Sequence, residues 1–333
     1  MIRIFTAFAA VLVWAMSAAI APAAAADKVV LMLNWYVYGE HAPFYYGKAK
    51  GIYAAEGIDL EIQEGRGSAA TTQAVAAKTA NFGYVDIPTM MRAAIKGAPV
   101  IATGVLLQTS PMSVMGLADK NIRKPEDIKG KTVAITPADS MTQIWPLFLK
   151  KTGLKESDFK TVAGDGQTKL NAVINGQADL LLGYVMDQSM KIKDAIGKDV
   201  YPIKFADYGI NMVSSGIIAN TDYVKQNADV VKRFMSATTK AVEAAEKDPS
   251  GAAQSILDAN PKGGKIDTLT QGFELTIPLY RTAETKSKRP FEVTDQIMTD
   301  TVNLLVEYGG LEAKAKDNPK AFYTNDYLPK GGS

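Results

Sequence analysis

The chain has 333 residues, of which 47% are hydrophobic and 22% are charged, and its formal net charge is +2. Such a balance is typical of an ordinary globular protein and argues against a nucleic-acid binder, which usually presents a strongly basic face. The sequence has no cysteine and a single histidine, His41, so disulfides, a lipid-modified N-terminal thiol and a zinc, copper or iron–sulfur site are not expected.

Residues 1–26 have the pattern of a secretory signal peptide. Arg3 precedes an almost wholly apolar stretch, residues 4–21, and the segment ends in the small residues of 22–26. We expect cleavage after Ala26 and a periplasmic protein without a lipid anchor. The alternative is an uncleaved membrane anchor, because the apolar run approaches the length that spans a bilayer. The remaining chain is long enough for two domains.

Beyond the signal, short apolar runs alternate with segments of helical periodicity. Strands are expected at residues 28–33, 58–62, 81–85, 132–136, 159–162, 178–182 and 214–219, and two further apolar runs cover 99–107 and 112–118. Helices are expected at 42–55, after 65–68, after Asp86, and at 140–151, 167–175, 222–246, 251–260, 268–279 and 293–308. Asp86 is a candidate helix cap followed by Pro88, and Ser140 with Gln143 fits a capping box.

This order of elements predicts an α/β protein with two lobes. Repeated strand–helix–strand units favour mainly parallel sheets flanked by helices. Two extended chain crossings, near residues 109–113 and 213–215, suggest that residues 27–112 and 216–333 form lobe 1 and residues 113–215 form lobe 2. In such sheets, ligands bind beyond the carboxyl ends of the strands, where helix N-termini converge.

Several motifs carry a resemblance to a known family. The first runs from Leu33 to Tyr45 (LNWYVYGEHAPFY) and continues through 51–60; later ones are Gly83-Tyr84-x-Asp86, 96–100, 127–131 and 176–179. Together they resemble the thiamine-pyrimidine (NMT/THI-type) branch of ABC-importer solute-binding proteins, which is related to the nitrate, taurine and sulfonate binders. The resemblance implies a two-lobed periplasmic-binding-protein fold of type II, with two chain crossings. It also implies a membrane permease with its ATPase as partners.

Aromatic side chains crowd the loop that follows the first strand. Trp35, Tyr36, Tyr38 and Tyr45 lie there, and their rings offer flat apolar area to a planar solute. We expect Trp35 to stack on the ligand with a second ring, Tyr84 or Tyr184 as candidates. The alternative is that these rings fill the core of the lobe.

Polar candidates follow other strands. His41 and Asn34 either bond the ligand or make local structural bonds. Gly67 and Ser68, and likewise Asp139 and Ser140, precede helices whose free N–H groups attract an anion, and Arg66 would clamp a carboxylate or sulfonate. Asp187 stands where the resembling branch has an acid that accepts from an aminopyrimidine, although that acid is usually Glu; otherwise it is a helix cap. Asp86 and Gln108 complete the predicted set.

The resemblance also extends to thiamine-pyrimidine synthases. In those enzymes a lysine and a histidine near the third strand carry the chemistry, and the corresponding positions here are Val85 and Thr89. Their cysteine-rich stretch corresponds to residues 212–215, which contain no thiol. The sequence therefore favours a monomeric binder of a small aromatic solute, without a cofactor and without catalysis. The alternatives are a binder of sulfonate-type anions and a component that presents its ligand to a membrane sensor.

Overall fold

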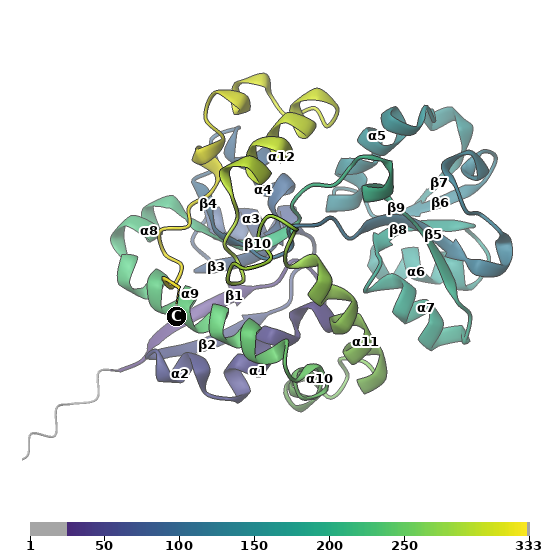
Figure 1. Cartoon of the computed structure of the whole chain (residues 1–333). Coiled ribbons are helices and arrows are strands. Elements are labelled where there is room, and N and C mark those ends of the chain that lie inside the picture. The colour runs from purple at the N-terminus through teal and green to yellow at the C-terminus, as the bar shows by residue number, and fades with distance from the viewer. Residues whose placement is uncertain (1–24, 332–333) are drawn as a thin grey trace, which may run out of the picture.

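The computed structural model describes residues 25–331, and it places them in two lobes, each built on a five-stranded sheet (Figure 1). The predicted signal peptide lies, apart from its last two residues, outside the described residues. None of the described helices combines the length and apolar character needed to cross a bilayer.

The two sheets have the same plan. In lobe 1 the strand order is β2 (Ile58–Gln63), β1 (Asp27–Met32), β3 (Phe82–Asp86), β10 (Ser215–Asn220) and β4 (Val100–Val105). In lobe 2 it is β7 (Lys160–Ala163), β6 (Thr132–Ile135), β8 (Leu180–Tyr184), β5 (Met112–Leu117) and β9 (Val200–Lys204). Within each sheet one strand, β10 or β5, runs against the others. The prediction of an α/β fold with mainly parallel sheets is confirmed.

Helices cover both sheets (Figure 1). Those of lobe 1 are α1 (Ala42–Ala49), α2 (Ile52–Ala55), α3 (Ser68–Ala76), α4 (Ile87–Ala94), α8 (Thr221–Gln226), α9 (Ala228–Ala245), α10 (Pro249–Ala259), α11 (Ile266–Thr276) and α12 (Asp295–Glu307). Those of lobe 2 are α5 (Ser140–Thr152), α6 (Gly166–Ile174) and α7 (Gln188–Ile196). The inner strands are buried on both faces, which explains their continuous apolar runs.

Some local predictions need correction. The helix expected at 42–55 is broken by Gly51, whose φ of 71° ends α1, and the helix expected at 222–246 is broken at Asn227. The capping box at Ser140 is wrong, because Asp139 caps α5 by accepting from the Thr142 N–H at 2.7 Å. Strand β9 was not predicted.

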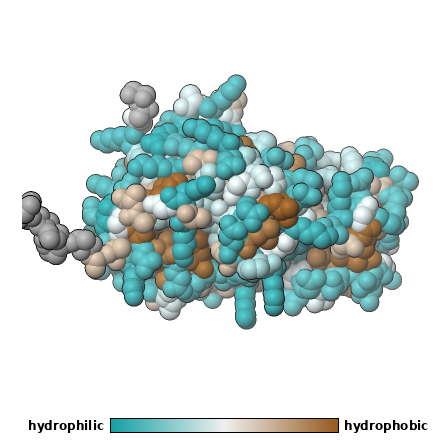
Figure 2. Space-filling model, turned by 90° about the horizontal axis from the view of Figure 1, so that it is seen from below, coloured by the Kyte–Doolittle hydropathy of each residue, from teal (hydrophilic) through white to brown (hydrophobic). Residues whose placement is uncertain are grey.

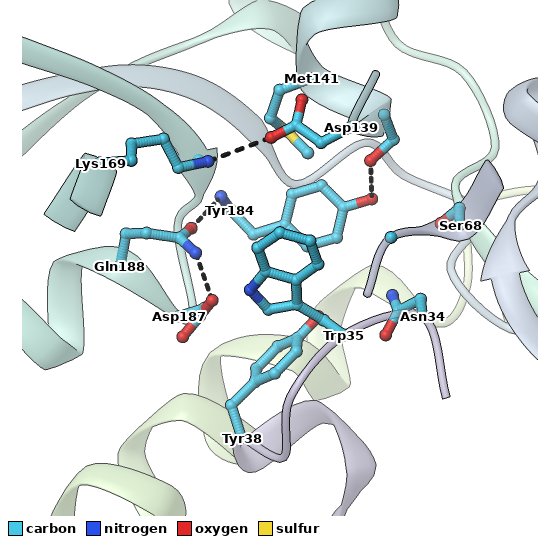
Figure 3. Close-up of a pocket in the computed structure, with 13 residues that line it drawn as sticks. Asn34, Trp35, Tyr38, Ser68, Asp139, Met141, Lys169, Tyr184, Asp187 and Gln188 are labelled. Atoms are coloured by element: carbon cyan, nitrogen blue, oxygen red, sulfur yellow. Dashed lines mark hydrogen bonds and ion pairs between the residues drawn. The ribbon is translucent and has the colours of Figure 1, made fainter. Parts of the chain in front are cut away.

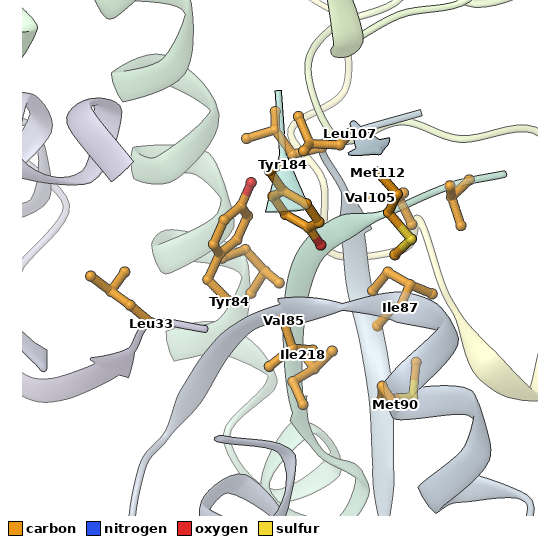
Figure 4. Packing of buried hydrophobic residues seen from close by; sticks show 14 of the residues in the cluster. Leu33, Tyr84, Val85, Ile87, Met90, Val105, Leu107, Met112, Tyr184 and Ile218 are labelled. Atoms are coloured by element: carbon orange, nitrogen blue, oxygen red, sulfur yellow. The ribbon is translucent and has the colours of Figure 1, made fainter. Parts of the chain in front are cut away.

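The chain passes between the lobes twice, once after β4 and once before β10. The two crossing segments run side by side, and the Ser214 N–H donates to the Leu107 carbonyl at 2.8 Å. Buried side chains of both lobes, Tyr84 and Tyr184 among them, pack around these crossings (Figure 4). The connection between the lobes is therefore a packed, hydrogen-bonded pair of segments rather than a loose linker.

Candidate functional site

A cavity of about 40 Å³ lies between the lobes, at the carboxyl ends of β1 and β8 (Figure 3). Lobe 1 contributes the loop after β1 and the start of α3, and lobe 2 contributes the start of α5, one side chain of α6 and the segment after β8. The lining residues are Asn34, Trp35, Tyr38, Gly67, Ser68, Asp139, Ser140, Met141, Lys169, Gly183, Tyr184, Asp187 and Gln188.

Trp35 reaches from lobe 1 to lobe 2. A Cβ atom at Gly166 would lie 2.5 Å from Trp35 Cζ2, so only glycine at that position lets the indole approach α6 so closely. Its other neighbour, Gly67, has a φ of 118°, which favours glycine as well. The indole N–H is buried and lies near the Tyr36 hydroxyl, but it makes no well-formed hydrogen bond.

Asp187 is buried opposite Trp35 and is only half satisfied. Its Oδ2 accepts from the Tyr36 hydroxyl at 3.0 Å and from the Gln188 amide, whereas Oδ1 has no hydrogen-bond partner. The ammonium of Lys191 lies 3.9 Å from Oδ1. Burial raises the pKa of Asp187 above its usual value, and the positive charge of Lys191 opposes that shift. The Asp187 side chain makes no capping bond to α7, so a helix cap does not explain it.

Lys169 and Asp139 form a buried ion pair at the cavity wall. Lys169 Nζ lies 3.1 Å from Asp139 Oδ2, and the two side chains are 2% and 8% exposed. The ammonium also lies 6.0 Å from the centre of the Trp35 ring. Because Asp139 caps α5 as well, this pair ties α6 to the start of α5.

A chain of polar groups crosses the hinge behind the cavity. The Tyr184 hydroxyl lies 3.4 Å from Ser140 Oγ and 3.2 Å from Ser214 Oγ. Ser214 in turn donates to Asp86 Oδ2 at 3.3 Å, and the Asp86 N–H donates to Ser68 Oγ at 3.0 Å. Asp86 also caps α4 as predicted, accepting from the Thr89 N–H, and burial raises its pKa to about 6. Groups of both lobes are therefore coupled at the hinge.

His41 lies behind the cavity rather than in it. Its Nδ1 accepts from the Tyr38 N–H at 3.4 Å and its Nε2 faces Asn34 Oδ1 at 2.8 Å, an arrangement that requires the neutral ring to donate from Nε2. Burial lowers the pKa of His41 to about 3, in agreement with a neutral ring. His41 therefore orients the Asn34 amide, and it is Asn34 that lines the cavity.

Tyr84 is fully buried beneath the cavity and does not line it. Its hydroxyl donates to Glu40 Oε1 at 2.6 Å, and the Tyr38 hydroxyl donates to the other oxygen of the same carboxyl. Among the described residues 25–331 Glu40 has no ion-pair partner, and burial raises its pKa to about 7. Of the two predicted stacking partners, Tyr184 is thus the one that shares the cavity with Trp35.

The structure places the remaining predicted residues elsewhere. Tyr45 is buried in α1, Arg66 is exposed and outside the cavity, and Gln108 is held at the first crossing by Thr285 and the Glu292 carbonyl.

Met141, Lys169, Gly183 and Gln188 line the cavity but were not predicted. No pattern in the sequence singles out these four residues, because α6 already contains polar residues beside Lys169. Within residues 25–331 no cluster of acidic and histidine side chains has the arrangement of a metal site.

The sequence also resembles characterised proteins. A riboflavin-binding protein, RibY, of Chloroflexus aurantiacus is 25% identical over 311 residues, which are 92% of this chain and 87% of that protein. A 4-amino-5-hydroxymethyl-2-methylpyrimidine phosphate synthase of Legionella pneumophila is 25% identical over 78% of this chain and 79% of the enzyme.

A solved structure and a family profile complete the comparison. The alkanesulfonate-binding protein SsuA of Xanthomonas axonopodis pv. citri, bound to MOPS, superposes with a TM-score of 0.68 at 15% identity, covering 90% of this chain and all of that one. This likeness establishes a periplasmic-binding-protein fold. The profile of the family described as NMT1/THI5 like matches residues 39–252, about two thirds of the sequence. The chain therefore belongs to the NMT1/THI5-like family.

Proposed function

We propose that this protein is the solute-binding component of an ABC importer, and that the interlobe cavity takes a small, flat heteroaromatic solute. The proposal rests on one observation above all. The aromatic rings of Trp35 and Tyr184 line the same cavity as two residues with a buried polar atom that makes no hydrogen bond, the Trp35 indole N–H and Asp187 Oδ1, the latter 3.9 Å from the Lys191 ammonium. Buried polar atoms without partners are rare in proteins, so a pair of them in an interlobe cavity favours a ligand that satisfies them.

These two protein atoms define which hydrogen-bonding groups one edge of the solute must carry. Figure 3 shows the indole nitrogen of Trp35 on the side of the ring that faces Asp187. An N–H donor needs an acceptor from the solute, and a carboxylate oxygen needs a donor. A ring nitrogen next to an amino group, as in an aminopyrimidine, supplies both on one edge. Stacking on the indole would add about 0.5–1.5 kcal/mol beyond the burial of area.

The lobes must separate to admit such a ring. The cavity measures about 40 Å³, whereas an engineered protein cavity that binds benzene measures about 150 Å³. The contacts that join the lobes across the opening include the Tyr36–Asp187 hydrogen bond and the ion pair between Lys265 and Asp194 at 2.6 Å. We propose that the lobes open at the two crossings and that a solute touching both lobes draws them together again.

Binding is favoured over the chemistry of the relatives named as synthases. Val85 is buried in β3 and Thr89 is bonded to Asp86, and these are the positions where the synthases have their lysine and histidine. The lysine that does line the cavity, Lys169, is engaged in a buried ion pair with Asp139 and is therefore not free to attack a carbonyl group, as imine formation requires. Release of the solute unchanged is therefore part of the proposal.

An anionic solute such as a sulfonate is disfavoured at the inner cavity. Arg66, the predicted clamp, is exposed and outside it, and Lys169 is neutralised by Asp139. The carboxylate of Asp187 repels an anion, since like charges in a buried site cost several kcal/mol. We therefore prefer a heteroaromatic solute to a sulfonate for the inner cavity.

We also propose the localisation of the protein and its partners. The predicted signal peptide at residues 1–26 favours export to the periplasm, where a monomer would deliver its solute to a permease and its ATPase. If the protein instead presents its solute to a membrane sensor, we expect a receptor gene beside its own gene rather than genes for a permease and an ATPase.

Calorimetric titration of the purified protein tests the ligand class. The panel is an aminopyrimidine, riboflavin and an alkanesulfonate, each measured with wild type and with Trp35→Ala. We expect a ring compound to bind and Trp35→Ala to weaken it at least tenfold, because stacking and buried area are lost together. Binding of the sulfonate alone, with equal affinity in Trp35→Ala, would refute the proposal.

A further inference from the structure

A buried acid lies beneath the interlobe cavity. Glu40 is fully buried, and its carboxyl accepts hydrogen bonds from the hydroxyls of Tyr38 and Tyr84, the second at 2.6 Å. Tyr38 also lines the cavity, so a single side chain separates this carboxyl from the space between the lobes. A buried carboxylate without a cation beside it is costly, and the binding of a solute in the cavity does not by itself explain it.

The surroundings of Glu40 also hold the two chain crossings. Ser215, at the start of β10, lies beside the carboxyl, and its own carbonyl accepts from two N–H groups of the first crossing at 2.9 Å each. Tyr280 is influenced by the charge of Glu40, and its buried hydroxyl has no hydrogen-bond partner. It follows Leu279, whose carbonyl accepts from the Gln108 N–H at 2.8 Å. The acid therefore lies among groups that fix the hinge.

Lobe 2 packs against the part of lobe 1 that carries Glu40. A Cβ atom at Gly272 of α11 would lie 2.8 Å from the Met186 carbonyl oxygen and 3.7 Å from Gly39 Cα. Gly39 precedes Glu40 in lobe 1, and Met186 precedes Asp187 in lobe 2. Three backbone segments thus meet without side chains between them. Closure of the lobes brings the carboxyl of Asp187 toward that of Glu40.

Closed lobes make it harder for Glu40 to ionise. Burial raises the pKa of Glu40 to about 7, and the negative charge of Asp187 adds to the rise. The ammonium of Lys191 lies beside Asp187, at 3.9 Å. The other titratable groups around Glu40 are neutral, because burial raises the pKa of each tyrosine and lowers that of the histidine; they are Tyr38, Tyr84, Tyr184, Tyr280 and His41. Separation of the lobes removes Asp187 and admits water to Tyr38, and both changes lower the pKa of Glu40.

The outer rim of the cleft does not hold the lobes together strongly. Its ion pair between Lys265 and Asp194 has side chains that are 68% and 29% exposed, and ion pairs at a surface contribute little. Figure 2 shows that the lower face of the molecule, where α7 and α11 meet, is largely hydrophilic, with its hydrophobic side chains in small separate groups. The balance between open and closed lobes is therefore sensitive to one charge beneath the cavity.

We infer that Glu40 makes lobe closure depend on a proton: its neutral form favours closed lobes and its ionised form favours open lobes. The inference rests on the proposed opening of the lobes, but not on which solute binds. Because the closed form holds the proton more tightly, the preference for closed lobes is present at low pH and is lost as pH rises through about 7. Solute affinity falls with it, since closed lobes contact the solute from both sides.

Energy transfer between two dyes measures lobe separation in solute-free protein. The chain has no cysteine, so Gln254→Cys on α10 and Asn171→Cys on α6, both exposed, place one dye on each lobe. We expect the open fraction to rise from pH 5.5 to pH 8.5. A difference of about one between the pKa values of Glu40 in the two forms changes the ratio of open to closed molecules about tenfold.

Three variants assign the pH dependence to its group. Glu40→Gln mimics the neutral acid and should abolish the dependence near pH 7, whereas Glu274→Gln, at an exposed position of α11, should leave it unchanged. Asp187→Asn should move the dependence to lower pH without abolishing it, because the charge that opposes Glu40 is gone. A wild-type pH dependence in Glu40→Gln would overturn the inference. So would a flat profile in Asp187→Asn, and this second result decides the matter even if Glu40→Gln does not fold.

The outcomes also separate this inference from the proposed function. Lobes that open and close to the same extent at every pH would overturn the role of the proton and leave the solute site standing. Lobes that stay together in every sample, with or without an aminopyrimidine or riboflavin, would overturn both.

Discussion

Replacing Asp187 with Asn tests whether this buried acid is kept for the ligand. The substitution preserves the shape of the side chain and its bond from Tyr36, but it removes the negative charge at Oδ1, which has no hydrogen-bond partner. If the solute donates a hydrogen to this oxygen, a charge-assisted bond worth about 1.5–3 kcal/mol is lost. Affinity for an aminopyrimidine should then fall by about 10- to 100-fold.

The same substitution should stabilise the unliganded protein. Because burial raises the pKa of Asp187, the fold favours its neutral form. The stability linked to this group is therefore present below the ordinary pKa and is lost as pH rises through the folded-state pKa. At pH 7.5 the carboxylate costs stability, and Asn relieves that cost. A gain of about 1 kcal/mol would raise the melting temperature by about 2–4 °C.

Calorimetric titration and thermal unfolding at pH 7.5 measure both effects on one preparation. Asp317→Asn, at an exposed position, is the matched control and should change neither affinity nor stability. A variant of Asp187 that binds the aminopyrimidine as tightly as wild type would refute the role of the acid. A variant that loses stability along with affinity would show that the carboxylate serves the fold.

Three further substitutions follow from the same contacts. Of the tryptophans in residues 25–331, Trp35 lines the cavity and Trp145 is packed in lobe 2. Solute binding should therefore quench tryptophan fluorescence in wild type but not in Trp35→Phe. Quenching that survives in Trp35→Phe would contradict the placement of the solute beside Trp35. The pKa of Glu40 is raised to about 7, so the stability linked to its protonation is lost as pH rises. In urea unfolding, the free energy of unfolding lost on Glu40→Gln should therefore be about 2 kcal/mol smaller at pH 8 than at pH 5. A loss that does not change with pH would argue against titration of Glu40. Lys169→Met should lower the free energy of unfolding by about 3–5 kcal/mol, because it leaves Asp139 buried and unpaired, and adding Asp139→Asn should recover much of this loss. If the losses of the two single variants in urea unfolding simply add, the ion pair does not contribute as described.

Local patterns in the sequence predicted the sheets well because buried parallel strands are nearly continuous apolar runs. Strand β8, with all five residues buried, is an example. Strand β9 escaped prediction because its pattern is mixed, with two exposed and two half-buried positions and a proline, Pro202. That proline is tolerated because β9 lies at the edge of its sheet.

The candidate site was predicted in part, and the limit was long-range pairing. The loop after β1 and the helix starts at Ser68 and Ser140 were found because ligands gather at the carboxyl ends of strands. The sequence could not predict which aromatic ring faces the cavity: Tyr184 ends β8 and lines the cavity, whereas Tyr84 lies in the middle of β3 and its hydroxyl bonds to Glu40 in the core. Contacts such as Tyr36 with Asp187, 151 residues apart, depend on how the lobes meet.

Identification of the small molecule that remains bound during native purification tests the central claim most directly. The protein is denatured, and the released compound is identified and quantified by mass spectrometry. We predict a flat heteroaromatic compound at up to one equivalent, recovered chemically unchanged after prolonged incubation with fresh protein. Recovery of an aliphatic anion in its place, or conversion of the compound by the pure protein, would contradict the account.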